Sequence, residues 1–315
     1  MKELCCSFGD GGHLAGIITE PRDAHGDTLV VLVNAGLVPK HGPYRLYALL
    51  ARRLAQEGIR TLRFDLGDIG DSQPAHVGMA LEQRTQLEIG AAVQMVCERF
   101  SPRRVVLGGL CSGAEDSYRY AATDPRISGV IMIDPFAYPT AGWRWRDALY
   151  RIVRRSLLTL GLRRPRDHSF VRLFRKALAQ PEGRVASSGA LAIRPESSGP
   201  AHLNYRHMAH AQASGILTSL VARGTRLHFI YTGGARPRFN HAGQLAAMFQ
   251  ELDFRDRVSL DYFPHLEHMQ PLHGERLTLI EAICKFLAQL RATSGAMPSV
   301  LVAPDLQRPT QSSAM

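Results

Sequence analysis

Short apolar runs and longer amphipathic segments alternate along most of this chain. The run at residues 28–33 is continuous and rich in β-branched side chains, which is typical of a strand buried on both faces of a parallel sheet. The segment 81–100 places Ile89, Val93 and Val96 on one stripe at the helical period. The same two patterns predict further strands at residues 4–8, 14–18, 60–66, 105–110, 127–134, 227–232 and 258–263, and further helices that begin at Pro43, follow residue 112, cover 241–252 and close the fold at 277–290.

This order of elements predicts an α/β fold. An amino-terminal hairpin over residues 3–20 comes first, and strands and helices then alternate. Such alternation is typical of a doubly wound, mostly parallel sheet with helices on both faces. In sheets of this kind the ligand site lies beyond the carboxyl ends of the strands. Loops at that edge are therefore the place to search for chemistry.

One basic segment interrupts the alternation. Between residues 144 and 176 there are eleven Arg or Lys residues and two Asp, a local excess close to the net charge of +10 for the whole chain. Leucines, isoleucine and valine lie between the basic residues, so we expect one or two basic amphipathic helices. We predict two core parts at 1–134 and 223–292, a basic helical insertion at 135–222 and a disordered tail at 293–315.

Composition narrows the class of protein. With 45% hydrophobic and 21% charged residues and no apolar run long enough to span a bilayer, the chain is expected to be globular. The amino terminus has no long apolar stretch of the secretory kind, which predicts a cytoplasmic protein. Its five cysteines are scattered, which predicts free thiols. The aspartates at 65–71 lack the distal glutamate of an EF-hand, so we expect turn capping, with no metal or cofactor.

The predicted strand at 105–110 runs directly into a nucleophile motif. Its sequence is Gly109-x-Cys111-x-Gly113, the pattern of a nucleophile elbow with cysteine in place of the usual serine. Small residues are needed on both sides because the nucleophile has a strained backbone and neighbouring Cβ atoms would collide. The motif predicts Cys111 as a nucleophile. Ser112 is the alternative, one residue out of register with the glycine pair.

This strand, turn and helix resemble the α/β-hydrolase superfamily over roughly residues 1–292. The Gly-x-Cys-x-Gly version is similar to thiol-bearing members such as dienelactone hydrolase. Asn34-Ala35-Gly36 and Arg63-Phe64-Asp65 add a similarity to the exosortase-associated hydrolases of bacteria. The resemblance implies an α/β-hydrolase fold in which the basic insertion forms a cap over the active site.

The resemblance also implies partners for Cys111. A histidine after the last strand is expected, and His268 fits that position better than His265 or His273. An imidazole and the amino end of a helix would both favour the thiolate, which is the reactive form. The backbone N–H groups of Ser112 and Leu37 are implied as donors to an oxyanion.

The third member of the triad departs from the family pattern. Residues 233–240, which follow the strand at 227–232, contain no carboxylate where members commonly have one. Asp134, at the end of the preceding strand, is the best substitute. Asn240 is the alternative, since an amide orients the imidazole in papain-like sites.

These residues predict acyl transfer through a Cys111 acyl-enzyme, by hydrolysis of an ester or thioester or by transfer to an alcohol or amine. A catalytically inactive scaffold or carrier-protein-binding module is the alternative, favoured by the missing acid. The basic insertion predicts an acidic partner, either an acyl carrier protein or coenzyme A thioester or the anionic surface of the inner membrane. Nucleic acid is not expected, because no binding motif occurs. The sequence does not indicate an oligomeric state.

Overall fold

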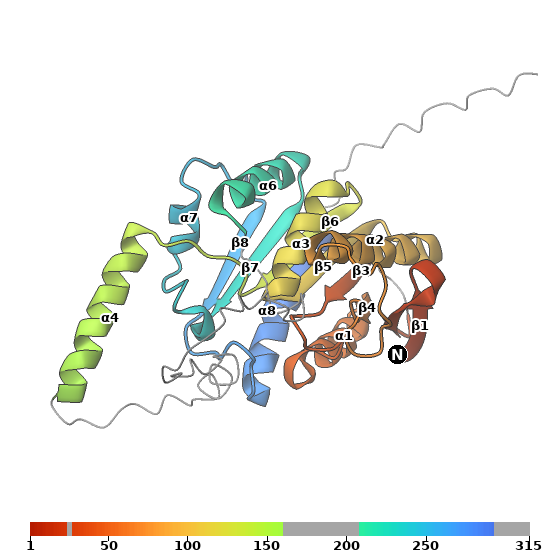
Figure 1. The fold of residues 1–315 in the computed structure, drawn as a ribbon, viewed down its shortest axis with the longest axis horizontal. Coiled ribbons are helices and arrows are strands. Elements are labelled where there is room, and N and C mark those ends of the chain that lie inside the picture. The colour runs from red at the N-terminus through yellow and green to blue at the C-terminus, as the bar shows by residue number, and fades with distance from the viewer. Residues whose placement is uncertain (24–26, 160–207, 293–315) are drawn as a thin grey trace, which may run out of the picture.

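The computed structural model describes residues 1–23, 27–159 and 208–292. Their strands form a single sheet in the order β1-β2-β4-β3-β5-β6-β7-β8 (Figure 1). β2 is antiparallel to β1 and β4, and the remaining strands are parallel to one another. The strands are β1 (Lys2–Phe8), β2 (Leu14–Glu20), β3 (Thr28–Val33), β4 (Arg60–Phe64), β5 (Arg104–Leu110), β6 (Ile127–Ile133), β7 (Arg226–Thr232) and β8 (Val258–Phe263). The predicted doubly wound, mostly parallel sheet is confirmed.

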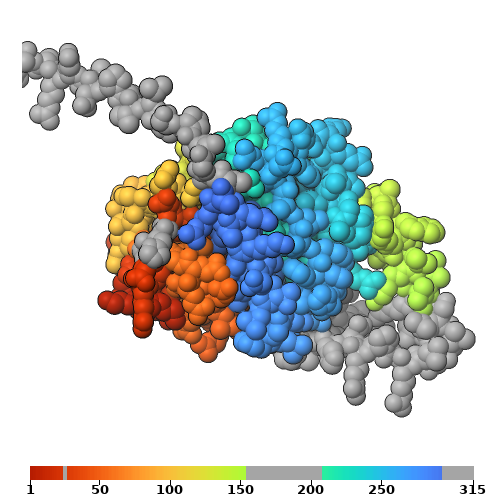
Figure 2. Space-filling model, turned by 180° about the vertical axis from the view of Figure 1, so that it is seen from behind, coloured from red at the N-terminus to blue at the C-terminus, as the bar shows by residue number. Residues whose placement is uncertain are grey.

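Helices cover both faces of this sheet. Alternate residues of β3 lie in two different buried clusters, because successive side chains of a strand point to opposite faces. Val31 and Val33 pack with α2, α3 and α6, whereas Val30 and Leu32 pack with α1 and α8. On the face seen in Figure 2, α1 (orange) lies beside the surface of α8 (blue). The helices are α1 (Leu46–Gln56), α2 (Leu81–Phe100), α3 (Ser112–Thr123), α4 (Ala141–Thr159), α6 (His210–Arg223), α7 (Gln244–Met248) and α8 (His273–Ala292).

Two predicted helices differ from those observed. Pro43 opens a short 3-10 turn, and α1 begins only at Leu46 because Tyr44 and Arg45 have φ angles of 46° and 67°. The helix predicted at 241–252 is reduced to α7, which has five residues. The side chain of the buried Gln244 hydrogen-bonds to the N–H of Asn240 and the carbonyl of Arg238. These bonds hold the preceding residues as a loop, where the pattern had predicted the start of a longer helix.

Two helices with different surroundings, α4 and α6, lie in the described part of the predicted insertion. α4 extends away from the sheet in Figure 1. α6 lies on the core, where Tyr118 of α3 donates its hydroxyl to the carbonyl of Ala213 at 2.8 Å. The end of the predicted insertion, residues 208–222, is therefore part of the layer that covers the sheet, because α6 buries Leu217 and Leu220 in the core beside α3. Residues 160–207 and the tail at 293–315 lie outside the described part of the chain.

Candidate active site

Cys111 lies at the sharp turn between β5 and α3. Its φ and ψ angles are 55° and −117°, a strained backbone conformation for a residue with a side chain. The flanking glycines allow the turn to form. A Cβ atom on Gly109 would lie 2.3 Å from the carbonyl carbon of Gly113, and one on Gly113 would lie 2.5 Å from the carbonyl oxygen of Asn34. The glycine pair in the motif thus has the steric function expected of it.

The elbow is tied to its neighbouring strands by hydrogen bonds. The buried Tyr47 hydroxyl donates to the carbonyl of Val33 at 3.1 Å and accepts from the N–H of Leu110 at 2.8 Å. The N–H of Cys111 itself donates to the carbonyl of Ile133 at 2.8 Å. These bonds fix the backbone on both sides of Cys111. Tyr47 was not predicted to support the elbow, because the hydrophobic pattern of α1 indicates only that its face is buried.

His268 reaches this turn from the loop after β8. Its Nδ1 lies 2.7 Å from Oδ2 of Asp134, and Cys111 lies near enough to the ring to raise its pKa. Because Nδ1 faces Asp134, Nε2 is the ring nitrogen left for the thiol. Burial lowers the pKa of His268, but Asp134 and Cys111 together raise it more, to about 10. A protonated imidazole beside Cys111 is the partner that a thiolate requires.

Asp134 is fully buried at the carboxyl end of β6, with a φ angle of 47°. Its Oδ1 accepts the N–H of Thr232 at 2.7 Å, and its Oδ2 accepts the Thr232 hydroxyl at 2.6 Å. With His268, the carboxylate thus has three hydrogen-bond donors. Thr232 was not predicted as a site residue. The available signal was its position at the end of β7, the strand adjacent to β6.

The two glycines after Thr232 leave no room for a side chain at their positions. A Cβ atom on Gly233 would lie 2.2 Å from the carbonyl oxygen of Pro264, and one on Gly234 would lie 2.4 Å from the amide nitrogen of His268. The N–H of Gly234 also donates to the carbonyl of Leu266 at 3.2 Å. The loop after β7 is therefore packed directly against the backbone that carries His268, and the carboxylate that contacts His268 comes from the end of β6.

The two segments predicted to supply oxyanion donors are joined to each other. The N–H of Gly36 donates to the hydroxyl of Ser112 at 2.7 Å, and the N–H of Val38 closes a turn onto the carbonyl of Ala35. Ser112 is the first residue of α3, where backbone N–H groups have no acceptor within the helix. Leu37 lies between the two bonded residues of the loop. The Ser112 hydroxyl is held by this contact, which disfavours it as the nucleophile.

The other candidate residues lie elsewhere. The side-chain amide of Asn240 donates to the carbonyl of Trp143 at 3.0 Å, so it braces the start of α4 and does not hold His268. His265 and His273 are both exposed.

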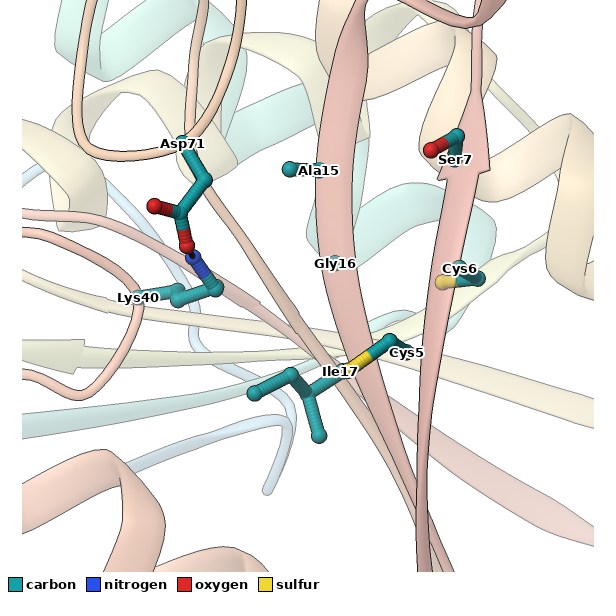
Figure 3. A pocket seen from close by; sticks show the side chains of 8 residues that line it. All are labelled: Cys5, Cys6, Ser7, Ala15, Gly16, Ile17, Lys40 and Asp71. Carbon is teal, nitrogen blue, oxygen red and sulfur yellow. Dashed lines mark hydrogen bonds and ion pairs between the residues drawn. The ribbon is translucent and has the colours of Figure 1, made fainter.

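Aspartates of the loop after β4 surround a lysine. The ammonium group of Lys40 contacts carboxylate oxygens of Asp65 at 2.6 Å and Asp71 at 2.5 Å. Asp65 also accepts the N–H of Asp71 at 3.0 Å, which is turn capping of the predicted kind. Lys40 and Asp71 line a shallow pocket together with residues of the β1–β2 hairpin (Figure 3). Neither Cys111 nor His268 lines this pocket.

Solved structures share this architecture. An α/β serine hydrolase without a lid from Xanthomonas campestris is 15% identical, with a TM-score of 0.52 over 95% of this chain and 98% of that one. An α/β hydrolase from Penicillium sp. is 15% identical, with a TM-score of 0.59 over 93% and 100%. An esterase from Pyrococcus furiosus is 12% identical, with a TM-score of 0.57 over 91% of each chain.

No family model matches the sequence, and neither does any curated protein. The structural likeness shows that this chain has the α/β-hydrolase fold. At such low identity it shows the fold alone. The role of Cys111 as the nucleophile and the closer similarity to exosortase-associated and dienelactone hydrolases stay predictions.

Proposed function

We propose that this protein is a cysteine-dependent acyl-transfer enzyme acting on esters or thioesters. The observation that carries the proposal is the chain of contacts from Cys111 through His268 to Asp134. A nucleophile on a strained turn, a histidine that it contacts and a buried acid on the far ring nitrogen have the relationships of a catalytic triad. Asp134, which Thr232 holds by two hydrogen bonds, supplies the carboxylate that is missing after β7, and this argues against an inactive scaffold.

In the proposed first step, the Cys111 thiolate attacks the carbonyl carbon of the substrate and a carbon–sulfur bond forms. The negative charge moves to the carbonyl oxygen, where the N–H groups of Ser112 and Leu37 are the proposed donors. The bond to the leaving group then breaks, and the leaving alkoxide or thiolate takes the proton from protonated His268. The product of this step is a thioester on Cys111.

In the second step, His268 accepts a proton from the incoming water, alcohol or amine, whose oxygen or nitrogen attacks the thioester carbonyl. The carbon–sulfur bond breaks, and the thiolate of Cys111 and protonated His268 are restored. Asp134 keeps Nδ1 occupied throughout, so Nε2 is the nitrogen that carries the transferred proton. An amine is a suitable acceptor, because thioesters react with amines more readily than oxygen esters do. A Cys111 acyl-enzyme therefore favours transfer to an amine more than a serine acyl-enzyme would.

Turnover of p-nitrophenyl esters and short acyl thioesters tests this proposal. We expect activity from the wild-type chain and a loss of roughly a hundredfold or more for Cys111→Ala and His268→Gln. Cys97→Ala serves as the matched control, since Cys97 lies on α2 away from the elbow, and it should retain activity. Turnover that survives Cys111→Ala would refute the proposed nucleophile.

A further inference from the structure

α4 presents an apolar stripe to solvent. Trp145, Leu149, Ile152 and Val153 are exposed by 69%, 48%, 62% and 48%, respectively. Their spacing places them along one side of the helix. Large apolar side chains exposed singly are normal, but a contiguous stripe of four on one helix is typical of an interaction surface.

The remainder of α4 is strongly basic. The helix carries five arginines and one acid, Asp147, whose carboxylate pairs with Arg151 at 2.6 Å. Arg144 and Arg146 are exposed on either side of Trp145. A helix with low overall hydrophobicity, an apolar stripe that includes tryptophan, and arginines beside it is typical of helices that lie in the interface of an anionic bilayer. No helix of the described chain has the length and apolar character to cross one.

The base of α4 is attached to the edge of the sheet that carries the candidate active site. The carbonyl of Trp143 accepts the side-chain amide of Asn240, and the guanidinium of Arg236 lies 3.2 Å from the ring centre of Tyr150. Both partners belong to the loop after β7, whose first glycines pack against the His268 loop. α4 is therefore anchored at the same edge of the sheet as Cys111.

We propose that α4 docks this protein on anionic lipid bilayers, with its apolar stripe in the headgroup region and its arginines on lipid phosphates. A bilayer is favoured over a soluble acidic partner because the stripe is continuous, includes tryptophan and has arginines beside it. The proposal rests on α4 and is independent of the chemistry of Cys111. If both proposals hold, the enzyme acts on acyl groups presented at the membrane surface.

Vesicle sedimentation with the full chain tests the docking. We compare phosphatidylcholine vesicles with vesicles of equal parts phosphatidylcholine and phosphatidylglycerol. The expected result is at least a tenfold preference for the anionic vesicles, weakened by salt. Leu149→Glu should reduce binding about tenfold or more, because it places a charge in the apolar stripe. Leu277→Glu on α8 is the matched control, since Leu277 is 51% exposed, and it should bind like the wild type.

A second pair of variants tests the charge. Arg144→Glu with Arg146→Glu should abolish the preference for anionic vesicles, whereas Arg103→Glu, whose side chain is 68% exposed near β5, should change binding little. In a Trp143→Phe background, Trp145 fluorescence should shift to the blue on binding. Cys111→Ala should bind normally, so loss of turnover and loss of docking are separate results.

Three results would overturn the docking proposal. One is the absence of binding to either vesicle at low salt. Another is binding that Leu149→Glu and Leu277→Glu reduce equally. The third is capture of α4 by an acidic acyl carrier protein with no binding to vesicles, which would assign the surface to that partner.

Discussion

Thr232 gives both its backbone N–H and its hydroxyl to the carboxylate of Asp134, at 2.7 and 2.6 Å. Asp134 lies on β6 and Thr232 ends the adjacent strand β7, so the two bonds join neighbouring strands at the sheet edge where His268 arrives. The acid of the candidate triad is thus held by a residue at the point where the sequence lacks a carboxylate.

We expect Thr232→Val to reduce kcat roughly ten- to hundredfold, because Asp134 loses a donor and the histidine is held less firmly. The free energy of unfolding of this variant should be lower by about 1–3 kcal/mol, because a buried acceptor loses its partner. Thr232→Ser keeps the hydroxyl and should retain most activity. The measurement is kcat together with chemical denaturation, and equal effects of Val and Ser would show that the hydroxyl has no role.

Gly234→Ala should displace the loop that carries His268. The added Cβ would lie 2.4 Å from a backbone nitrogen, a contact that requires the chain to move. We expect a loss of activity of roughly a hundredfold, because small displacements of catalytic groups are costly.

Gly215→Ala on α6 is the control for this change. A Cβ at Gly215 meets nothing within 4 Å, so the variant should keep its activity and gain up to about 1 kcal/mol of stability. Circular dichroism distinguishes displacement of the His268 loop from unfolding. Full activity in Gly234→Ala would contradict the packing described for this loop.

Alkylation rates should separate Cys111 from Cys6, Cys97 and Cys284. Burial raises the pKa of Cys6 and Cys97, and it raises that of Cys284 to about 11, so these thiols are protonated at pH 7. We expect iodoacetamide to label Cys111 at least about tenfold faster than these three, as measured on the separated peptides. His268→Gln should remove the difference, whereas the exposed His265→Gln should not. Uniform labelling in the wild type would contradict the thiolate–imidazolium pair.

Because the pKa of His268 is raised in the folded protein, the stability of the protein should depend on pH. Its ordinary value of 6.5 applies to the unfolded chain, and the folded value is about 10. A folded pKa above the unfolded one stabilises the protein fully below pH 6.5, and this contribution disappears as the pH rises through about 10. The free-energy difference between wild type and His268→Gln should therefore be at least about 1 kcal/mol larger at pH 6 than at pH 10. A constant difference would refute protonated His268.

The parts of the fold that depend on local pattern could be predicted from the sequence. The bounds of α2 follow from its apolar stripe, and the elbow follows from glycines needed next to Cys111. Leu277 shows the limit of periodicity, because it continues the stripe of α8 and is nevertheless exposed. Whether Leu277 is buried depends on which elements pack against it, and the sequence pattern of α8 does not give that information.

The supporting residues of the site depend on contacts between distant segments. Thr232 and Asp134 are separated by 98 positions, and Tyr47 and Leu110 by 63. No spacing rule relates such pairs until the strand order is known. Asn240 shows that a suitable position in the chain can also mislead. It was a candidate to orient His268, but its side-chain amide binds the backbone of Trp143.

Trapping the acyl-enzyme tests the central claim most directly. The wild-type chain is mixed with p-nitrophenyl acetate, quenched in acid and digested, and the peptide containing Cys111 and Ser112 is fragmented by mass spectrometry. We predict one acetyl group on Cys111, removed by neutral hydroxylamine as a thioester should be and absent from Cys111→Ala. Acetylation of Ser112, or ester turnover with no acyl group on Cys111 at any quench time, would contradict it.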